Sequence, residues 1–220
     1  MKINICTLDP EEKINNTDWL LIKDSVKKHA KIGCEALSIK TLNVTIYPNK
    51  DWCIKQTGDG GYTANFDWIQ VFIDPAKSVS KIINLSFPAT LYHEMNHARR
   101  MIKIGFGKTL LETVISEGLA IVFAEEMFKN FEAPWGKYSE EEIKRLYKVF
   151  ISHKDDENFN YQEWFLGFGK PHWLGYKIGA HIVRGLKEKG KKFSSIKLVD
   201  TPASKIYNDW YNLNMITKLK

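Results

Sequence analysis

The chain has few cysteines, and no two of them lie close enough together to form a metal-binding motif. Cys6, Cys34 and Cys53 are widely separated and none belongs to a Cys-x-x-Cys pair. This spacing argues against a cysteine-ligated zinc site, and an odd, sparse set of cysteines does not make a disulfide framework. We therefore expect three free thiols and a reducing, cytoplasmic location, with unconventional export as the alternative.

The sequence also lacks any run of about 20 apolar residues, so it predicts no membrane-spanning helix. The stretch MKINICTLDPEEK has no secretory apolar core, because acidic residues interrupt it from Asp9 onward. No nucleic-acid-binding motif is recognisable. The formal net charge is +6, and much of it comes from lysines near the C-terminus. We interpret them as a solvated surface, with weak attraction to acidic substrates or membranes as the alternative. They are Lys187, Lys189, Lys191, Lys192, Lys197, Lys205, Lys218 and Lys220.

The segment TLYHEMNHARR, residues 90–100, places His93 and His97 four residues apart, with Glu94 directly after the first histidine. In a helix, residues i and i+4 lie on one face, so both imidazoles could hold one ion. Glu94 lies about 100° further round the helix, where its carboxylate could reach a water on that ion without being a ligand. This is the H-E-x-x-H arrangement of zinc hydrolases. The alternative is a helix with two ordinary histidines.

The residues around this motif predict a helix that begins at Ser86 and Phe87. Pro88 would lie in its first turn, where the missing N–H has no helical partner in any case. The apolar residues that follow repeat at helical spacing, so one stripe of the helix should face a core. These residues are Leu91, Met95, Ala98 and Ile102.

A second helix is predicted over residues 109–128, TLLETVISEGLAIVFAEEMF, and Glu117 lies deep in its apolar part. A buried carboxylate without a partner is costly, and a zinc ion would be a partner. We therefore favour Glu117 as the third zinc ligand over its main rival, Glu112. Pairing with one of the two arginines after the motif, or exposure to solvent, is the alternative. Gly118 has no side chain and could allow close approach to the first helix.

The motif and its spacing resemble a known class of enzymes. His93-Glu94-x-x-His97 followed by Glu117 in SEGLA is similar to the gluzincin branch of metallopeptidases, in which a glutamate on a second helix completes the site. The segments PATLYHEMNHARR and LLETVISEGLA resemble those of a bacterial family of predicted zinc-dependent proteases. That family also shows a GY-x-x-G segment, matched by residues 174–183, and a TPASKI-like end, matched by residues 201–206. The resemblance covers roughly residues 40–210 and implies a fold and a reaction class, but no particular substrate.

We predict an α+β fold, with a small antiparallel or mixed sheet packed on a mainly helical, zincin-like domain. Residues 1–220 are expected to form a single domain. Within it we expect an N-terminal helix and sheet at about 15–75, the active-site and ligand helices at about 86–128, and a C-terminal helical part at about 139–215.

Two strands are predicted before the motif. The β-branched alternation of SIKTLNVTIYPN predicts the first at residues 38–49. Glycines at positions 58, 60 and 61 predict a turn before the second, Asn65 to Ile73. In the zinc proteases that this layout resembles, the strand before the active-site helix often forms the cleft rim, where an extended peptide can add through main-chain hydrogen bonds. We therefore expect Asn65–Ile73 to be the substrate-side edge, with a plain internal strand as the alternative.

The sequence thus predicts a zinc-dependent peptidase. One Zn²⁺ would be held by His93, His97 and Glu117, with Glu94 as general base. The expected partner is a peptide or protein substrate. Two other classes stay open: a non-catalytic zinc-binding protein of regulation or assembly, against which the intact Glu94 argues, and a zinc hydrolase of a non-peptide amide. Neither the choice between endopeptidase and exopeptidase nor the oligomeric state follows from the sequence.

Acyl transfer also needs a donor for the developing oxyanion. Tyr176 and His172 are the candidates, and His181 is the third. Tyr176 lies in the segment shared with the similar family, and a packing role on a helix is its alternative.

Overall fold

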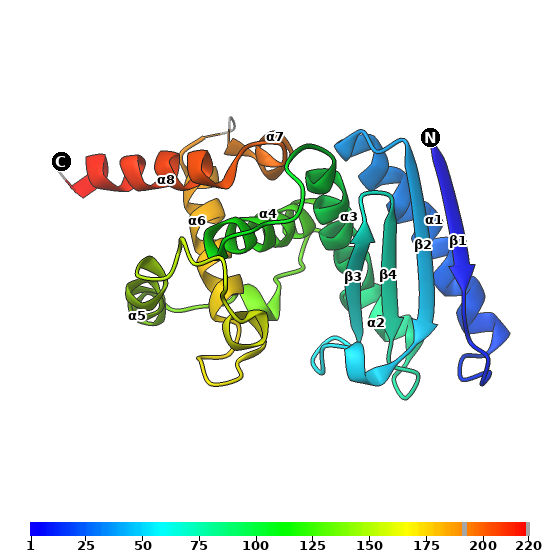
Figure 1. The fold of residues 1–220 in the computed structure, drawn as a ribbon. Helices are drawn as coiled ribbons and strands as arrows, with labels where there is room; N and C mark the ends of the chain where they lie inside the picture. Colours follow the sequence, from blue (N-terminus) through cyan, green and yellow to red (C-terminus); the bar gives the residue numbers. More distant parts are fainter. Residues whose placement is uncertain (191–192, 219–220) are drawn as a thin grey trace. The chain divides into compact units, whose positions relative to one another are not determined.

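The computed structural model describes residues 1–190 and 193–218 (Figure 1). The chain forms two compact units, one made of Met1–Ile102 with Phe123–Phe131 and the other of Lys103–Val122 with Glu132–Lys220. A small mixed sheet in a largely helical chain confirms the predicted α+β fold. The single domain over residues 1–220 stays a prediction.

The first unit is built on a four-stranded sheet with the strand order β1-β2-β4-β3. β2 is parallel to both of its neighbours, β1 and β4, and β3 is antiparallel to β4. The elements are β1 (Lys2–Thr7), α1 (Asn16–Leu37), β2 (Thr41–Pro48), η1 (Lys50–Trp52), β3 (Asp59–Asn65), β4 (Trp68–Ile73), α2 (Val79–Leu85) and α3 (Phe87–Lys103).

One face of the sheet is apolar and covered. Alternate residues of its two central strands are buried, as period-2 patterning requires, and α1 lies behind the strands in Figure 1. These residues are Leu42, Val44, Ile46, Ile69 and Val71. The other face carries polar side chains that bond one another. The hydroxyl of Tyr47, for example, donates to Gln70 Oε1 at 2.8 Å.

The expectation that Asn65–Ile73 forms the sheet edge is wrong. β4 lies between β2 and β3, so β3 is the edge strand on this side of the sheet and β1 is the edge strand on the other. The sequence pattern misplaces the edge because Gly60 and Gly61, which predict a turn, lie inside β3 instead. Glycine weakens a strand interior, and where it occurs another group often approaches the backbone closely. The turn of the hairpin follows Asn65, between β3 and β4.

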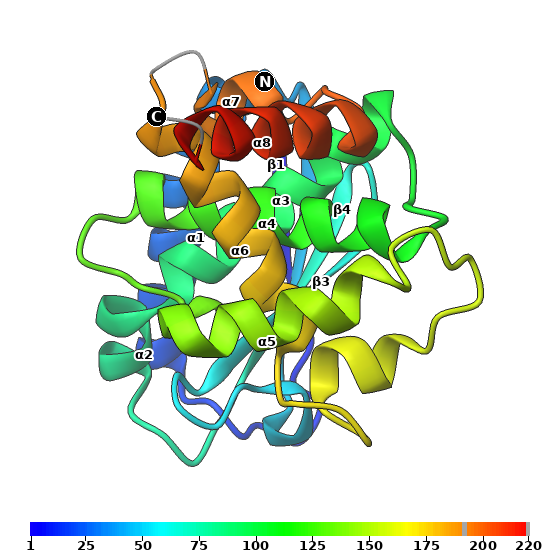
Figure 2. The same cartoon turned by 90° about the vertical axis from the view of Figure 1, so that its left-hand side faces the viewer.

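The second unit is helical in the part of it that the structure describes. α6 contacts α5 near one of its ends and α8 near the other (Figure 2). The elements are α4 (Leu110–Met127), η2 (Pro134–Gly136), α5 (Glu140–Ile151), the π-helical turn η3 (Gln162–Leu166), α6 (Leu174–Glu188), α7 (Ser195–Leu198) and α8 (Ala203–Lys218). A continuous apolar cluster joins α4, α5, η3, α6, α7 and α8, and its members include Leu110, Val114, Leu119, Phe150, Trp164, Phe165, Ile178 and Ile182.

The two helices predicted around the motif are present. α3 begins at Phe87 with Pro88 in its first turn, as predicted, and α4 matches the predicted range to within one residue at each end. Leu91, Met95 and Ala98 are fully buried, but Ile102 is 47% exposed. The apolar stripe of α3 therefore ends one turn earlier than the sequence predicts.

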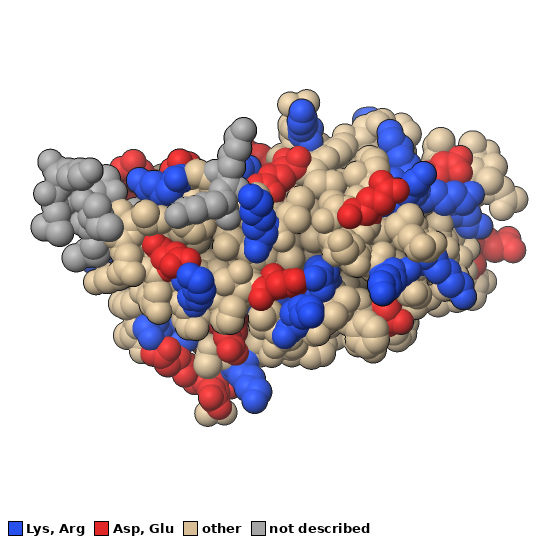
Figure 3. All heavy atoms as spheres, turned by 90° about the horizontal axis from the view of Figure 1, so that it is seen from above, with Lys and Arg blue, Asp and Glu red and all other residues tan. Residues whose placement is uncertain are grey.

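Charged side chains of both signs lie on the surface, and the cysteines form no disulfide. On the face drawn in Figure 3, basic side chains lie beside acidic ones, and Lys205 pairs with Asp209 at 3.0 Å. Of the C-terminal lysines, Lys191, Lys192 and Lys220 lie outside the described residues. All three cysteines are free thiols. Among the described helices, none combines the length and the apolar composition that crossing a membrane requires.

Candidate functional site

α3 carries the motif in an unusually buried setting. His93 and Glu94 keep only 7% and 6% of their surface exposed, and His97 is half-buried. Polar side chains in such surroundings need partners, because an unpaired buried polar group is destabilising. The two imidazoles and the carboxylate of this helix are therefore largely shielded from bulk water, in a place where they could interact with a bound ligand.

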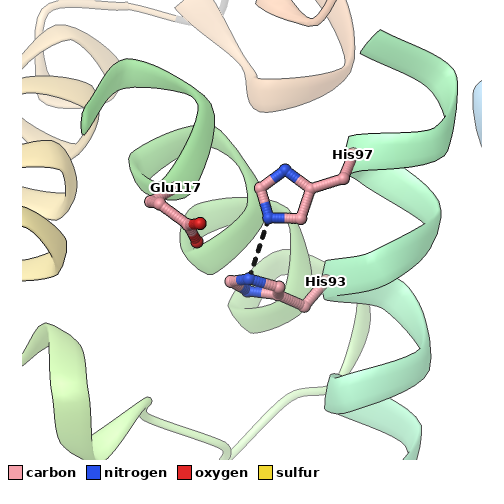
Figure 4. A group of neighbouring side chains, drawn as sticks. All are labelled: His93, His97 and Glu117. Carbon is pink, nitrogen blue, oxygen red and sulfur yellow. Dashed lines mark hydrogen bonds between the residues drawn. The ribbon is translucent and has the colours of Figure 1, made fainter. Parts of the chain in front are cut away.

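The two imidazoles point toward each other (Figure 4), and the Nε2 atoms of His93 and His97 lie 3.1 Å apart. Two nitrogens bound to one tetrahedral zinc, each about 2.05 Å from it, would be separated by about 3.3 Å. The i, i+4 spacing has thus placed the two nitrogens at the separation that one shared ion requires. The two histidines therefore fit one shared zinc ion.

Glu117 comes from α4 and completes the group. Its carboxylate is buried, with 7% of the residue exposed, and it points toward the two imidazoles in Figure 4. Ligand atoms of His93, His97 and Glu117 all lie within 4.8 Å of one another. Two imidazoles and one carboxylate form a donor set typical of catalytic zinc sites.

The rival carboxylate, Glu112, has a different role. Its Oε2 accepts hydrogen bonds from the main-chain N–H groups of Lys108, at 2.6 Å, and Thr109, at 3.2 Å. An acidic side chain at this position caps the N-terminus of α4 and interacts favourably with the helix dipole. The geometry therefore favours Glu117 over Glu112 as a ligand.

Gly118 allows a close helix crossing with α6. Its close approach to the motif helix, which the sequence suggests, stays a prediction. A Cβ atom at Gly118 would lie 2.2 Å from the main-chain oxygen of Gly179, and one at Gly179 would lie 2.1 Å from that of Val114. The two glycines thus let the backbones of α4 and α6 touch. Since Glu117 precedes Gly118 directly, this crossing also fixes the direction in which the Glu117 side chain leaves α4.

We expect Gly118→Ala to destabilise the protein, although alanine normally stabilises a helix by about 1 kcal/mol relative to glycine. Overpacking against a rigid backbone typically costs about 1–3 kcal/mol, which outweighs that gain. Urea unfolding measures the change. Gly185→Ala in α6 is the control, because its added methyl would meet the edge of one side chain, Trp210, rather than backbone. Equal or greater stability of Gly118→Ala would contradict the close crossing.

Tyr161 contacts Glu117, and the sequence does not indicate this contact. Its hydroxyl donates to Glu117 Oε1 at 3.3 Å and lies 3.0 Å from the hydroxyl of Tyr176. Its ring stacks on Phe165, with the centroids 4.5 Å apart. No local pattern could indicate this contact, because Tyr161 lies in an irregular, aromatic-rich segment far along the chain from Glu117. The richness of that segment in aromatics was the only signal.

The three predicted oxyanion donors lie in different surroundings. Tyr176 is linked to Glu117 through Tyr161. His172 is exposed and lies edge-on to Trp173, with the ring centroids 4.2 Å apart. His181 Nδ1 lies 3.3 Å from the Tyr138 hydroxyl, and burial lowers the pKa of its imidazole.

Glu94 is held by the edge strand β3. Thr63 Oγ1 lies 2.7 Å from Glu94 Oε2 and 2.9 Å from the main-chain oxygen of Glu94. Gly61, two residues earlier, leaves the space that the Glu94 side chain fills, since a Cβ there would lie 2.5 Å from Glu94 Cγ. Gly61 and Thr63 therefore line one side of the Glu94 carboxylate. Both lie in the segment that the sequence predicts as a turn.

A second buried carboxylate joins β3 to the start of α3. Asp59 is fully buried and accepts hydrogen bonds from the hydroxyls of Ser86, at 2.6 Å, and Thr90, at 2.7 Å. Burial raises the pKa of the Asp59 carboxyl, and the two hydroxyls act in the opposite direction. Asp59 thus fixes β3 against α3 one turn before His93.

Comparisons with known proteins identify one partial relative and one family. A protein of Bacillus subtilis (strain 168) named "Uncharacterized protein YjaZ" is 36% identical over 108 residues, which are 45% of this chain and 41% of that protein. The chain thus matches less than half of that relative's length. No solved structure matches the chain significantly. Residues 22–208 match the family described as "Predicted Zn-dependent protease (DUF2268)". The match covers most of the sequence, so the chain belongs to this family of predicted zinc-dependent proteases, as its motifs suggest.

Proposed function

We propose that this protein is a zinc-dependent peptidase in which His93, His97 and Glu117 hold one Zn²⁺ and Glu94 is the general base. One observation carries the proposal: two Nε2 atoms face each other at 3.1 Å, and a buried carboxylate lies within 4.8 Å of them. The description of the family supports the same reaction class.

The metal ligands and Glu94 have separate roles in the proposed hydrolysis of a peptide. When bound, zinc would lower the pKa of a water molecule and polarise the substrate carbonyl. Glu94 accepts a proton from the attacking water and then donates it to the leaving nitrogen, so one carboxylate acts first as base and then as acid. Because Glu94 is buried, its charge acts in surroundings that screen it less than water does.

Tyr176 and His172 stay the proposed donors to the oxyanion. The hydrogen bond between Tyr161 and Tyr176 supports Tyr176, since it connects that hydroxyl to the hydroxyl on Glu117. His172 is exposed, so it would have to reach the substrate from the surface. A hydroxyl or imidazole donor aimed at the developing charge is the usual source of this stabilisation.

We propose a peptide or protein as the substrate and β3 as the strand that aligns it. β3 is a sheet edge, and edge strands can pair with an extended peptide through main-chain hydrogen bonds. β3 also touches the proposed base through Thr63. A cytoplasmic location is part of the proposal, supported by three thiols that form no disulfide.

Hydrolysis of a defined peptide mixture tests the proposal. We expect the zinc-loaded protein to cut peptide bonds, to lose this activity when a chelator removes the metal, and to regain it when zinc returns. Mass spectrometry of the products identifies the bonds cut. Zinc binding without cleavage would favour a non-catalytic metal protein, and cleavage of small amides alone would favour a hydrolase of non-peptide amides.

A further inference from the structure

We propose that Thr63 is a positioning residue that holds the general base Glu94 in its working orientation from the edge strand β3. The inference rests on the proposed function, in which Glu94 is the base. It starts from three alternate residues of β3 that all meet α3. Asp59 bonds the start of the helix, Gly61 lies against the Glu94 side chain, and Thr63 bonds the Glu94 carboxylate.

The contact between Thr63 and Glu94 is short and buried. Thr63 is 6% exposed, and its hydroxyl lies 2.7 Å from Glu94 Oε2. A hydroxyl that donates to a carboxylate forms a charge-assisted hydrogen bond, which is stronger than a neutral one. This bond holds the carboxylate in one orientation, and the lone pairs that remain can accept the proton of the attacking water.

Gly61 restricts Glu94 from a second side. A Cβ at this position would lie 2.5 Å from Glu94 Cγ and 2.6 Å from Oε1, so the carboxylate rests directly on the β3 backbone. Glu94 cannot swing toward β3, and the hydrogen bond to Thr63 opposes movement away from it. Such restraint should raise the reaction rate, since small errors in the position of a reacting group can lower the rate substantially.

Thr63→Val tests the inference, because valine keeps the branched shape and removes the hydroxyl. We expect kcat to fall about tenfold, the lower range for a lost hydrogen bond to a charged group, with KM and zinc content unchanged. Thr63→Ser restores the donor and should return kcat to within about twofold of the parent. Gly61→Ala keeps the hydroxyl but pushes Glu94 aside, so it should lower kcat as well.

Thr90→Val is the matched control, because it removes a buried hydroxyl that bonds Asp59 and not Glu94. It should lower the unfolding temperature without changing kcat. If Thr63→Val lowered only the unfolding temperature, as the control does, its role would be structural and the inference wrong.

A readout that does not need turnover separates this inference from the proposed function. A hydroxamate chelates zinc and offers a proton that a nearby carboxylate accepts, so its affinity reports where Glu94 points. By calorimetry on zinc-loaded protein, we expect about tenfold weaker acetohydroxamate binding for Thr63→Val and little change for Thr63→Ser and Thr90→Val. If the parent cleaved no peptide but this pattern held, only the proposed function would fail. Equal affinity of Thr63→Val and the parent would overturn the inference.

Discussion

Glu117→Ala is expected to lose zinc on dialysis and to lose peptidase activity with it. The carboxylate lies within 4.8 Å of the ligand nitrogens of both histidines, and its removal leaves two ligands where a catalytic site needs three. Stability should change too, because a metal that binds only the folded state stabilises it by about 4 kcal/mol at a thousand times its Kd. Elemental analysis and thermal unfolding with added zinc measure both effects.

Glu112→Ala is the matched control for this experiment. It removes an equal side chain from the same helix, but one that caps the start of α4. We expect it to keep zinc and to lose only the stability of a helix cap, about 1 kcal/mol. If Glu112→Ala lost the metal and Glu117→Ala kept it, the assignment of the third ligand would be reversed.

Glu94→Gln should show the opposite combination, with zinc retained and turnover reduced by at least about 10²-fold, the lower end for the loss of general acid–base catalysis. Glutamine has nearly the same size, and its amide oxygen can still accept the hydrogen bond that Thr63 donates to Oε2. What it cannot do is take a proton from water. The fold and the metal site should therefore persist while the reaction stops.

Zinc content and kcat are measured on the same preparation of Glu94→Gln, beside the parent. Turnover close to that of the parent would show that another group takes the proton from water. Loss of zinc would show that Glu94 is itself a ligand. Either outcome contradicts the role we assign to Glu94.

The sequence predicts the centre of the proposed site because most of the proposed ligands lie close together in the chain. His93, Glu94 and His97 lie on one helical turn, so helix geometry alone brings the two nitrogens together. Glu117 could be singled out because a carboxylate in the apolar run of α4 needs a partner. Pro88 likewise marks the first turn of α3 correctly, since its missing N–H fits that position.

The walls of the site could not be predicted, because they depend on contacts between distant segments. Thr63 and Gly61 reach Glu94 from a strand whose glycines mimic a turn signal. Tyr161 reaches Glu117 from an irregular segment without periodicity. The edge was misplaced for the same reason: strand order is set by pairing, and β3 adds outside β4 although its composition is poor for a strand.

Diffraction at the zinc absorption edge from crystals of the zinc-loaded protein would show directly whether His93, His97 and Glu117 bind the ion. We predict one strong anomalous peak bonded to the Nε2 atoms of His93 and His97 and to a carboxylate oxygen of Glu117, each at about 2.0–2.2 Å. Glu94 should lie beside the ion without binding it. An absent peak, a peak ligated by other residues, or a Glu117 carboxylate more than about 5 Å from the ion would contradict the account.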